Sequence, residues 1–212
     1  MEESIYIDSI SYPVTNLGPG KRVVLWVQGC TLKCNGCMAI SMQERHEDAK
    51  KTVEDIFYAI RKASLGLDGI TISGGEPFEQ AEALLRLVRL IKEHTSLDIM
   101  VYSGYTIEDL NEQGESASKL LSLIDILIDG RFEEENSNKK LWRGSDNQRF
   151  HILSERAKKY ARYAEEEYRG QRELHFEMSE GNSFKIIGIP NRGFMRDLKK
   201  QCRGLGLTLT QP

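Results

Sequence analysis

The sequence has no excess of basic residues. Its 29 Lys and Arg against 32 Asp and Glu give a net charge of −3, so the chain presents no overall positive field to hold a long phosphate backbone. We therefore do not expect nucleic acid as a partner. The stretch KKYARYAEEEYR mixes tyrosines with charges of both signs. It is open to interpretation as a nucleic-acid or membrane contact, but a solvated helix face is the favoured interpretation.

Long apolar runs are also missing. The first ten residues, MEESIYIDSI, lack the positive and apolar regions of a signal peptide, and no stretch is apolar over the length of a membrane span. We therefore expect a cytoplasmic protein without membrane contact. Internal repeats and low-complexity tracts are missing too, and 212 residues suffice for one large core. Residues 1–212 are expected to form a single domain.

Cysteine is scarce, with four in the chain, yet Cys30, Cys34 and Cys37 crowd into CTLKCNGC. This spacing indicates metal binding in a reducing compartment rather than a disulfide framework. Iron–sulfur clusters are normally held by four thiolates, so three ligands would leave one iron open to a further ligand. A structural zinc site completed by His46 is the alternative. Three buried cysteines without a ligand are a weaker one, because the intervening residues are polar or small.

Strand and helix patterns alternate over the first two thirds of the chain. Apolar, β-branched runs predict strands, and apolar stripes at helical spacing predict helices. In chain order we expect strand 22–28, helix 52–63, strand 69–72, helix 81–91, strand 99–102, a short helix from 107 and strand 124–128. This alternation predicts an α/β fold with parallel strands, whose functional groups lie on loops at the carboxyl ends of the strands.

After Phe150 the pattern changes. We expect a charged helix at 154–169, strands at 174–178 and 184–189, then a final helix and a strand near Leu209. Cys202 shares helical spacing with Met195 and Leu198 on that last helix, which predicts core packing. A role for Cys202 as a fourth ligand or catalytic thiol is the alternative.

A second motif, SGGEP at Ser73–Pro77, follows the second predicted strand. Paired glycines let a backbone approach a ligand closely, and a carboxylate beside them can receive an ammonium group. Taken alone, the motif would be an ordinary turn with proline at a helix entry. Together, CxxxCxxC and GGE resemble the signature motifs of the radical S-adenosylmethionine (SAM) superfamily.

The resemblance implies a partial (β/α) barrel with about six parallel strands. It also implies that Cys30, Cys34 and Cys37 ligate a [4Fe-4S] cluster whose open iron is chelated by the amino and carboxylate groups of SAM. The remaining cofactor-binding candidates that it implies are Gly36, Met38, Gly74, Gly75, Glu76, Ser103 and Asp129. No general acid or base is inferred. The hydroxyl of Ser103 is equally explained as a local turn contact.

The blocks GPGKRVVLWVQGC, VYSGYTIEDL, DILIDGRFEEE and LWRGSDNQR resemble the activating enzymes of anaerobic ribonucleotide reductase over residues 15–150. That group implies reductive cleavage of SAM to a 5′-deoxyadenosyl radical, which takes a glycine hydrogen from a partner enzyme, with electrons from an external donor. The alternatives are radical SAM modification of a peptide, another protein or a small molecule, and a non-catalytic iron–sulfur or zinc module.

This chain departs from the group in two places. Met38 and Ala39 stand where the group commonly has an aromatic residue and an asparagine. Residues 151–212 continue where simple members end. We expect this extension either to complete the barrel or to form a surface for the partner.

Overall fold

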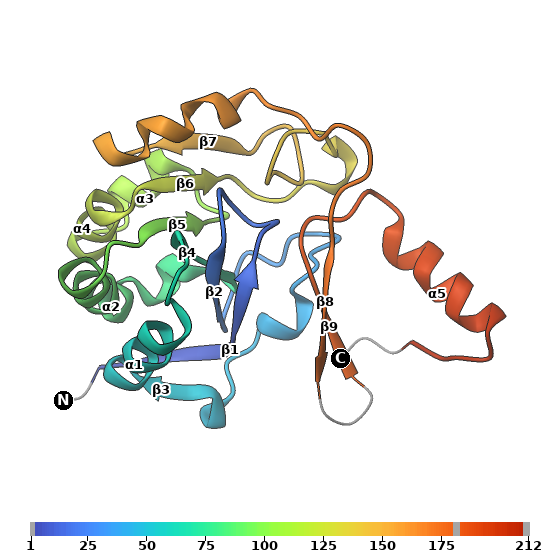
Figure 1. Ribbon diagram of the computed structural model, residues 1–212, viewed down its shortest axis with the longest axis horizontal. Helices are drawn as coiled ribbons and strands as arrows, with labels where there is room; N and C mark the ends of the chain where they lie inside the picture. Colours follow the sequence, from blue (N-terminus) through green and yellow to red (C-terminus); the bar gives the residue numbers. More distant parts are fainter. Residues whose placement is uncertain (1–2, 180–182, 210–212) are drawn as a thin grey trace.

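A computed structural model describes residues 3–179 and 183–209 as a mixed α/β structure. A seven-stranded sheet runs in the order β3-β1-β2-β4-β5-β6-β7 (Figure 1). Its strands are β1 (Ser4–Val14), β2 (Arg22–Val27), β3 (Lys50–Thr52), β4 (Gly69–Gly74), β5 (Asp98–Tyr102), β6 (Ile126–Asp129) and β7 (Arg149–Ile152). The α-helices are α1 (Val53–Ala63), α2 (Ala81–His94), α3 (Ile107–Glu112), α4 (Glu115–Leu123) and α5 (Phe194–Gly204).

The centre of the sheet is parallel and its margins are antiparallel. Strands β2, β4, β5 and β6 pair in parallel, whereas β1 pairs antiparallel with β2 and β3, and β7 pairs antiparallel with β6. The expectation of about six parallel strands is therefore wrong, since the parallel core has four. The β1 and β7 segments were not predicted as strands, because their apolar residues are interrupted by polar ones facing solvent.

Helices α1 to α4 cover one face of the sheet, at the left of Figure 1. Apolar stripes at helical spacing explain the packing, because α1 buries Ile56 and Ile60 while α2 buries Leu84, Val88 and Ile91. The side chain of Thr52 accepts a hydrogen bond from the Asp55 amide and caps α1, as its position predicts. These crossovers place the loops after β2, β4, β5 and β6 at one edge of the sheet.

Alternate strand residues face the other side of the sheet. Val24 and Trp26 of β2 pack there with Ile187, and Met100 of β5 packs with Trp142. The extension therefore supplies part of the cover of this second face. Since successive strand residues point to opposite faces, one strand serves both cores.

The extension is only partly as predicted. The two strands expected there exist as β8 (His175–Ser179) and β9 (Ser183–Ile187), which pair antiparallel. The helix expected at 154–169 is wrong in type and length, because residues Glu155–Ala164 are 3₁₀-helical (η5). Residues 205–209 contain no strand, and the remainder of the predicted strand lies outside the described residues.

Candidate functional site

The three clustered cysteines lie on the loop that follows β2. All three are free thiols and partly exposed. Backbone hydrogen bonds fold the loop back on itself: the amide of Cys30 donates to the carbonyl of Gln43 at 3.0 Å, and that of Cys37 donates to Cys34 at 3.3 Å. The latter turn has Gly36 at φ +74°, a conformation that favours glycine. The loop thus presents three thiols from one short segment.

Side chains from two other loops hold the cysteine loop in place. The amide and hydroxyl of Thr31 both donate to Glu79 Oε1, at 2.7 and 2.6 Å. The guanidinium of Arg131 donates to the carbonyl of Leu32. The sequence did not single out Thr31, Glu79 or Arg131, because their partnership depends on loops that are distant along the chain.

The GGE segment packs directly against the start of the cysteine loop. The amide of Gly75 donates to Val27 and that of Glu76 donates to Gly29, each at 2.7 Å. A Cβ on Gly75 would lie 2.3 Å from the carbonyl oxygen of Gly29, so no side chain fits there. Gly74 adopts φ +109° at the end of β4. The two glycines therefore allow the backbone after β4 to lie directly against the backbone at Val27 and Gly29.

The carboxylate of Glu76 is buried between loops. Its oxygens accept hydrogen bonds from Ser103 Oγ at 2.9 Å, from the Gly104 amide at 2.7 Å and from the Phe78 amide at 3.0 Å. Burial raises the pKa of Glu76 to about 7, although these hydrogen bonds lower it. The side chains of Glu76 and Ser103 join the loops after β4 and β5, and neither residue lines the cavity described below.

Asp129, at the end of β6, is also fully buried and partnered. Arg149 Nε lies 3.0 Å from its Oδ1, His151 Nε2 lies 3.0 Å from the same oxygen, and the Ile107 amide donates to Oδ2 at 2.7 Å. Burial raises the pKa of this carboxyl, but the contacts with His151 and Arg149 lower it more, to well below its usual range. In this structure Asp129 binds the first amide of α3 and joins β6 to β7.

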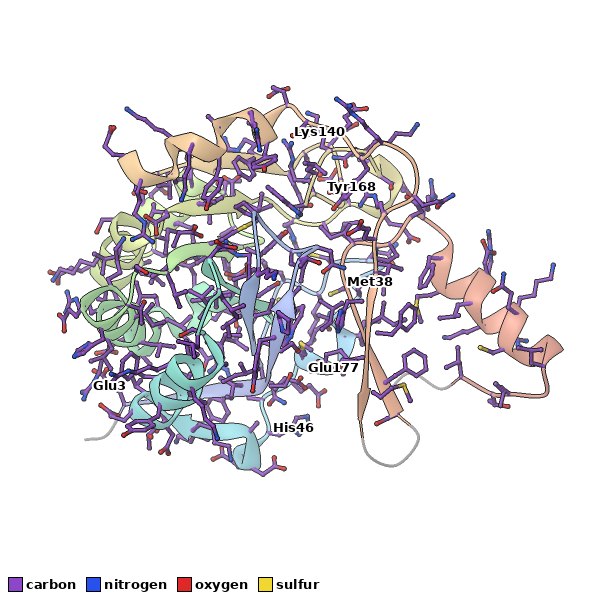
Figure 2. The ribbon with its side chains drawn as sticks, viewed as in Figure 1. Glu3, Met38, His46, Lys140, Tyr168 and Glu177 are labelled. Carbon is purple, nitrogen blue, oxygen red and sulfur yellow. The ribbon has the colours of Figure 1, made fainter. Side chains whose placement is uncertain are left out.

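A cavity of about 420 Å³ opens beside the cysteine loop. It is lined by Gly36, Cys37 and Met38 of the cysteine loop and by residues 188–196 of the extension. Figure 2 shows Met38 near the strands β8 and β9, while His46 lies well apart, near β3. The cavity is also lined by Trp26, Ser73, Tyr102 and Gln148 among others. Cys37 is the one cluster cysteine that lines this space.

The predicted site residues thus separate into two groups. Gly36, Cys37 and Met38 reach the cavity. The remaining cofactor-binding candidates make the internal contacts given above, and they are Gly74, Gly75, Glu76, Ser103 and Asp129. The sequence did not predict that Trp26, Tyr102 and residues 188–196 would line the same cavity.

The three thiols lie on one loop and are all partly exposed. Across residues 3–179 and 183–209, no three His, Cys, Asp or Glu side chains converge closely enough to hold one metal ion. The three cysteines and His46 are therefore not brought together as a four-ligand set in the described residues. Three soft thiolates on one loop suit iron–sulfur ligation.

Among the helices of the described residues, none is long and apolar enough to span a bilayer.

Comparison with known proteins identifies the family. The model of the family described as "4Fe-4S single cluster domain" matches residues 16–151. The anaerobic ribonucleoside-triphosphate reductase-activating protein of phage T4 is 36% identical over 138 residues, covering 62% of this chain and 84% of that protein. The protein of the same name from Vibrio cholerae is 35% identical over 148 residues, covering 66% and 94%.

The protein of that name from Escherichia coli K12 is 35% identical over 150 residues, covering 67% of this chain and 96% of its own length. Among solved structures, QueE from Escherichia coli matches with a TM-score of 0.45 and 16% identity, over 59% of this chain and 70% of that one, a likeness too weak to support an argument. The match to the family model and the coverage of these relatives show that this chain belongs to the 4Fe-4S single cluster domain family and to the family of the anaerobic ribonucleoside-triphosphate reductase-activating proteins.

Proposed function

We propose that this protein is a radical SAM activating enzyme that installs a glycyl radical on an anaerobic ribonucleoside-triphosphate reductase. The observation that carries the proposal is the position of Cys37. This thiol belongs to a three-cysteine loop and also lines a cavity of about 420 Å³. A cluster held there would stand beside a space of the size of a small-molecule ligand site. The named relatives supply the class of partner.

Cys30, Cys34 and Cys37 are the residues that would ligate the [4Fe-4S] cluster. A cluster bound there would supply the electron that cleaves SAM to methionine and a 5′-deoxyadenosyl radical, and an external donor would replace that electron. The chain positions the ligands through the Thr31–Glu79 and Arg131–Leu32 contacts, which hold the loop against its neighbours. Holding the reacting groups in place is the protein's main contribution to such chemistry.

The cavity walls suit SAM by their chemistry. The aromatic rings of Trp26 and Tyr102 and the side chain of Ile189 offer apolar surface for the adenosine part. Gly36 and Met38 flank the site on the cluster side. Gly74, Gly75, Glu76, Ser103 and Asp129 belong to the proposed cofactor site as the residues that shape its loops.

We also propose a fold, a domain organisation and a cellular compartment for the protein. The four parallel strands with outer helices support a partial (β/α) barrel of the radical SAM type, formed as one domain over residues 1–212. Residues 188–196 close one side of the cavity and so belong to the same unit as the cysteine loop. A reducing cytoplasm is the compartment that free thiols and an oxygen-sensitive cluster require.

The test is an anaerobic reconstitution with iron and sulfide, followed by mixing with SAM, a reductant and the anaerobic ribonucleoside-triphosphate reductase of the same organism. We expect 5′-deoxyadenosine and a stable glycyl radical on the reductase, detected by electron paramagnetic resonance. Formation of 5′-deoxyadenosine without a glycyl radical would contradict the proposed target but not the SAM chemistry.

A second candidate is radical SAM modification of another peptide or protein. The extension favours it, because residues 188–196 line the cavity although the matched family region ends at residue 151. A substrate that passes its hydrogen to 5′-deoxyadenosine can be traced by deuterium. If deuterium reached 5′-deoxyadenosine from another labelled protein and never from the reductase glycine, this second function would replace the first.

A further inference from the structure

The extension is fastened beside the cavity by buried contacts. Ile187 packs fully buried beside Val24 and Trp26 on the inner face of the sheet. The side-chain amide of Asn16 donates to the carbonyl of Ile187 at 2.8 Å and to that of Glu173 at 3.0 Å. These contacts fix the chain at the end of β9, so the residues that follow run along the cavity rim.

Helix α5 begins at that rim and leaves the body of the protein. Its first residues, Phe194, Met195 and Arg196, line the cavity. Beyond them the helix projects away from the sheet in Figure 1, and none of its residues is buried. A helix of this length is marginal unless another surface packs on it. The helix therefore connects the cavity rim to a surface on which a further molecule can pack.

The charge of this segment is opposite to that of the chain. Between residues 192 and 203 there are five basic side chains and one acidic one, giving +4, whereas the whole chain has −3. The remainder of the chain therefore has −7. The basic residues are Arg192, Arg196, Lys199, Lys200 and Arg203. A local positive patch on an acidic protein steers an acidic partner toward that patch.

The same helix has an apolar stripe. Phe194, Leu198 and Cys202 follow one another at intervals of four residues, which places them on one side, and each is only partly exposed. An amphipathic helix of this kind binds a partner surface that offers apolar contacts with opposite charges around them. Phe194 joins this stripe to the cavity.

From these observations we propose that α5 is a docking helix for an acidic, partly apolar segment of the glycyl-radical enzyme. The inference rests on the proposed function and names the surface through which the partner is held. A segment bound along α5 would be adjacent to Phe194 and the cavity rim, close to Cys37. A nucleic acid or an anionic membrane fits less well, because the remaining charge of −7 would repel a long polyanion.

The test uses a charge reversal at the outer end of α5. Lys200 and Arg203 are exposed, lie three positions apart on the helix and do not line the cavity. The double variant K200E/R203E is compared with R61E/K62E, which reverses two exposed charges at the end of α1, a helix of the opposite side. Binding to the anaerobic ribonucleoside-triphosphate reductase and cleavage of SAM without a partner are measured anaerobically for each reconstituted protein.

We expect K200E/R203E to weaken reductase binding by about tenfold at low salt, with a smaller salt dependence, since rim charges act mainly through long-range attraction. The control variant should bind as the wild type does, and partner-free SAM cleavage should stay within about twofold for both variants. Equal binding by wild type and K200E/R203E, with a glycyl radical still formed, would overturn the docking helix and leave the proposed function standing.

Two further outcomes are decisive. A wild-type protein that cleaves SAM but neither binds the reductase nor forms its radical would overturn the proposed function and the docking inference together. Phosphatidylglycerol vesicles and duplex DNA serve as competing probes. If K200E/R203E abolished binding to either probe and left reductase binding intact, α5 would be a membrane or nucleic-acid element and the proposal would be wrong.

Discussion

The region matched by the family and the extension are built in different ways. In residues 16–151 the helices cover the sheet with fully buried stripes, as Leu84 and Ile91 of α2 show. In the extension, β8 and β9 form a separate two-stranded sheet and α5 buries no residue. Within the extension, Ala157 still packs into the core on the second face of the sheet, whereas β8, β9 and α5 are attached through a few side chains such as Ile187. Residues 16–151 are therefore stabilised by their own core, whereas β8, β9 and α5 depend on a few contacts with it.

The attachment of β8 and β9 combines the buried contacts of Ile187 and Asn16 with polar pairs nearer the surface. Ser11 Oγ donates to Glu177 Oε2 at 2.7 Å, and Lys185 Nζ donates to Asp8 Oδ2 at 2.5 Å. Such exposed or half-exposed pairs contribute little individually. Changes in β8, β9 and α5 should therefore alter the cavity wall and partner binding before they alter the stability of the sheet.

The largest expected effect is the loss of the cluster and of SAM cleavage when a cysteine of the cysteine loop is replaced. Replacing the cysteine of the extension should have no such effect. Cys37→Ala should abolish both the cluster-dependent absorbance and the formation of 5′-deoxyadenosine, because one of three ligands is lost. Cys202→Ala on α5 is the matched control and should retain both. Retention of SAM cleavage in Cys37→Ala, or its loss in Cys202→Ala, would contradict the assignment of the ligands.

Truncating an apolar side chain should lower the free energy of unfolding more in the region matched by the family than in the extension. Ile91→Ala removes a fully buried side chain of α2 and should lower the free energy of unfolding by about 2–5 kcal/mol. Leu198→Ala on α5 should lower it by less than about 1 kcal/mol. Urea unfolding followed by circular dichroism measures both. Comparable losses would mean that α5 belongs to the main core.

Asn16 is the point at which the two regions can be uncoupled. Asn16→Ala removes two hydrogen bonds to extension carbonyls and leaves a buried acceptor without its partner, at a cost of about 1–3 kcal/mol. We expect faster proteolysis and faster amide exchange in β8 and β9, with unchanged protection of the parallel strands. Asn111→Ala, which loses one exposed hydrogen bond to Ile107, is the control. Uniform loss of protection would instead show one cooperative unit.

Glu76 should give the core a pH dependence that the extension does not share. Its raised pKa means that the folded state keeps a proton which the unfolded state has already released. Stability should therefore fall as pH rises from about 4.5 to about 7, by at most about 1.4 kcal/mol per pH unit. Glu76→Gln should flatten this part of the profile in urea unfolding of the cluster-free protein. An unchanged slope in the variant would show that Glu76 is not the titrating group.

The sequence predicted what depends on local pattern. The stripes of α1 and α2 and the parallel strands appear as expected, because the apolar spacing of a segment is visible in that segment alone. The antiparallel margins were missed, since pairing of Ser4–Val14 with its neighbours is decided by tertiary contacts. The 3₁₀ conformation of Glu155–Ala164 was missed for a similar reason.

For the site, the sequence identified the chemical groups but not their partners. The crowding of the cysteines and the paired glycines are local signals. In contrast, the hydrogen bond between Glu76 and Ser103 joins residues 27 positions apart. The cavity wall at residues 188–196 comes from a region outside the resemblance altogether. The contacts of Glu76 and Asp129 could be found only after the loops had been assembled in space.

The contacts of Glu76 connect the cysteine loop to the loops that follow β4 and β5. Its amide is bonded to Gly29, its carboxylate to Gly104, and Leu32 packs so tightly on Gly104 that a Cβ there would lie 2.3 Å away. These contacts tie Gly29 and Leu32 of the cysteine loop to the loops after β4 and β5. Electron transfer to a cluster bound there would therefore be accompanied by only a small rearrangement of the protein, which keeps the reorganisation energy of the reduction low.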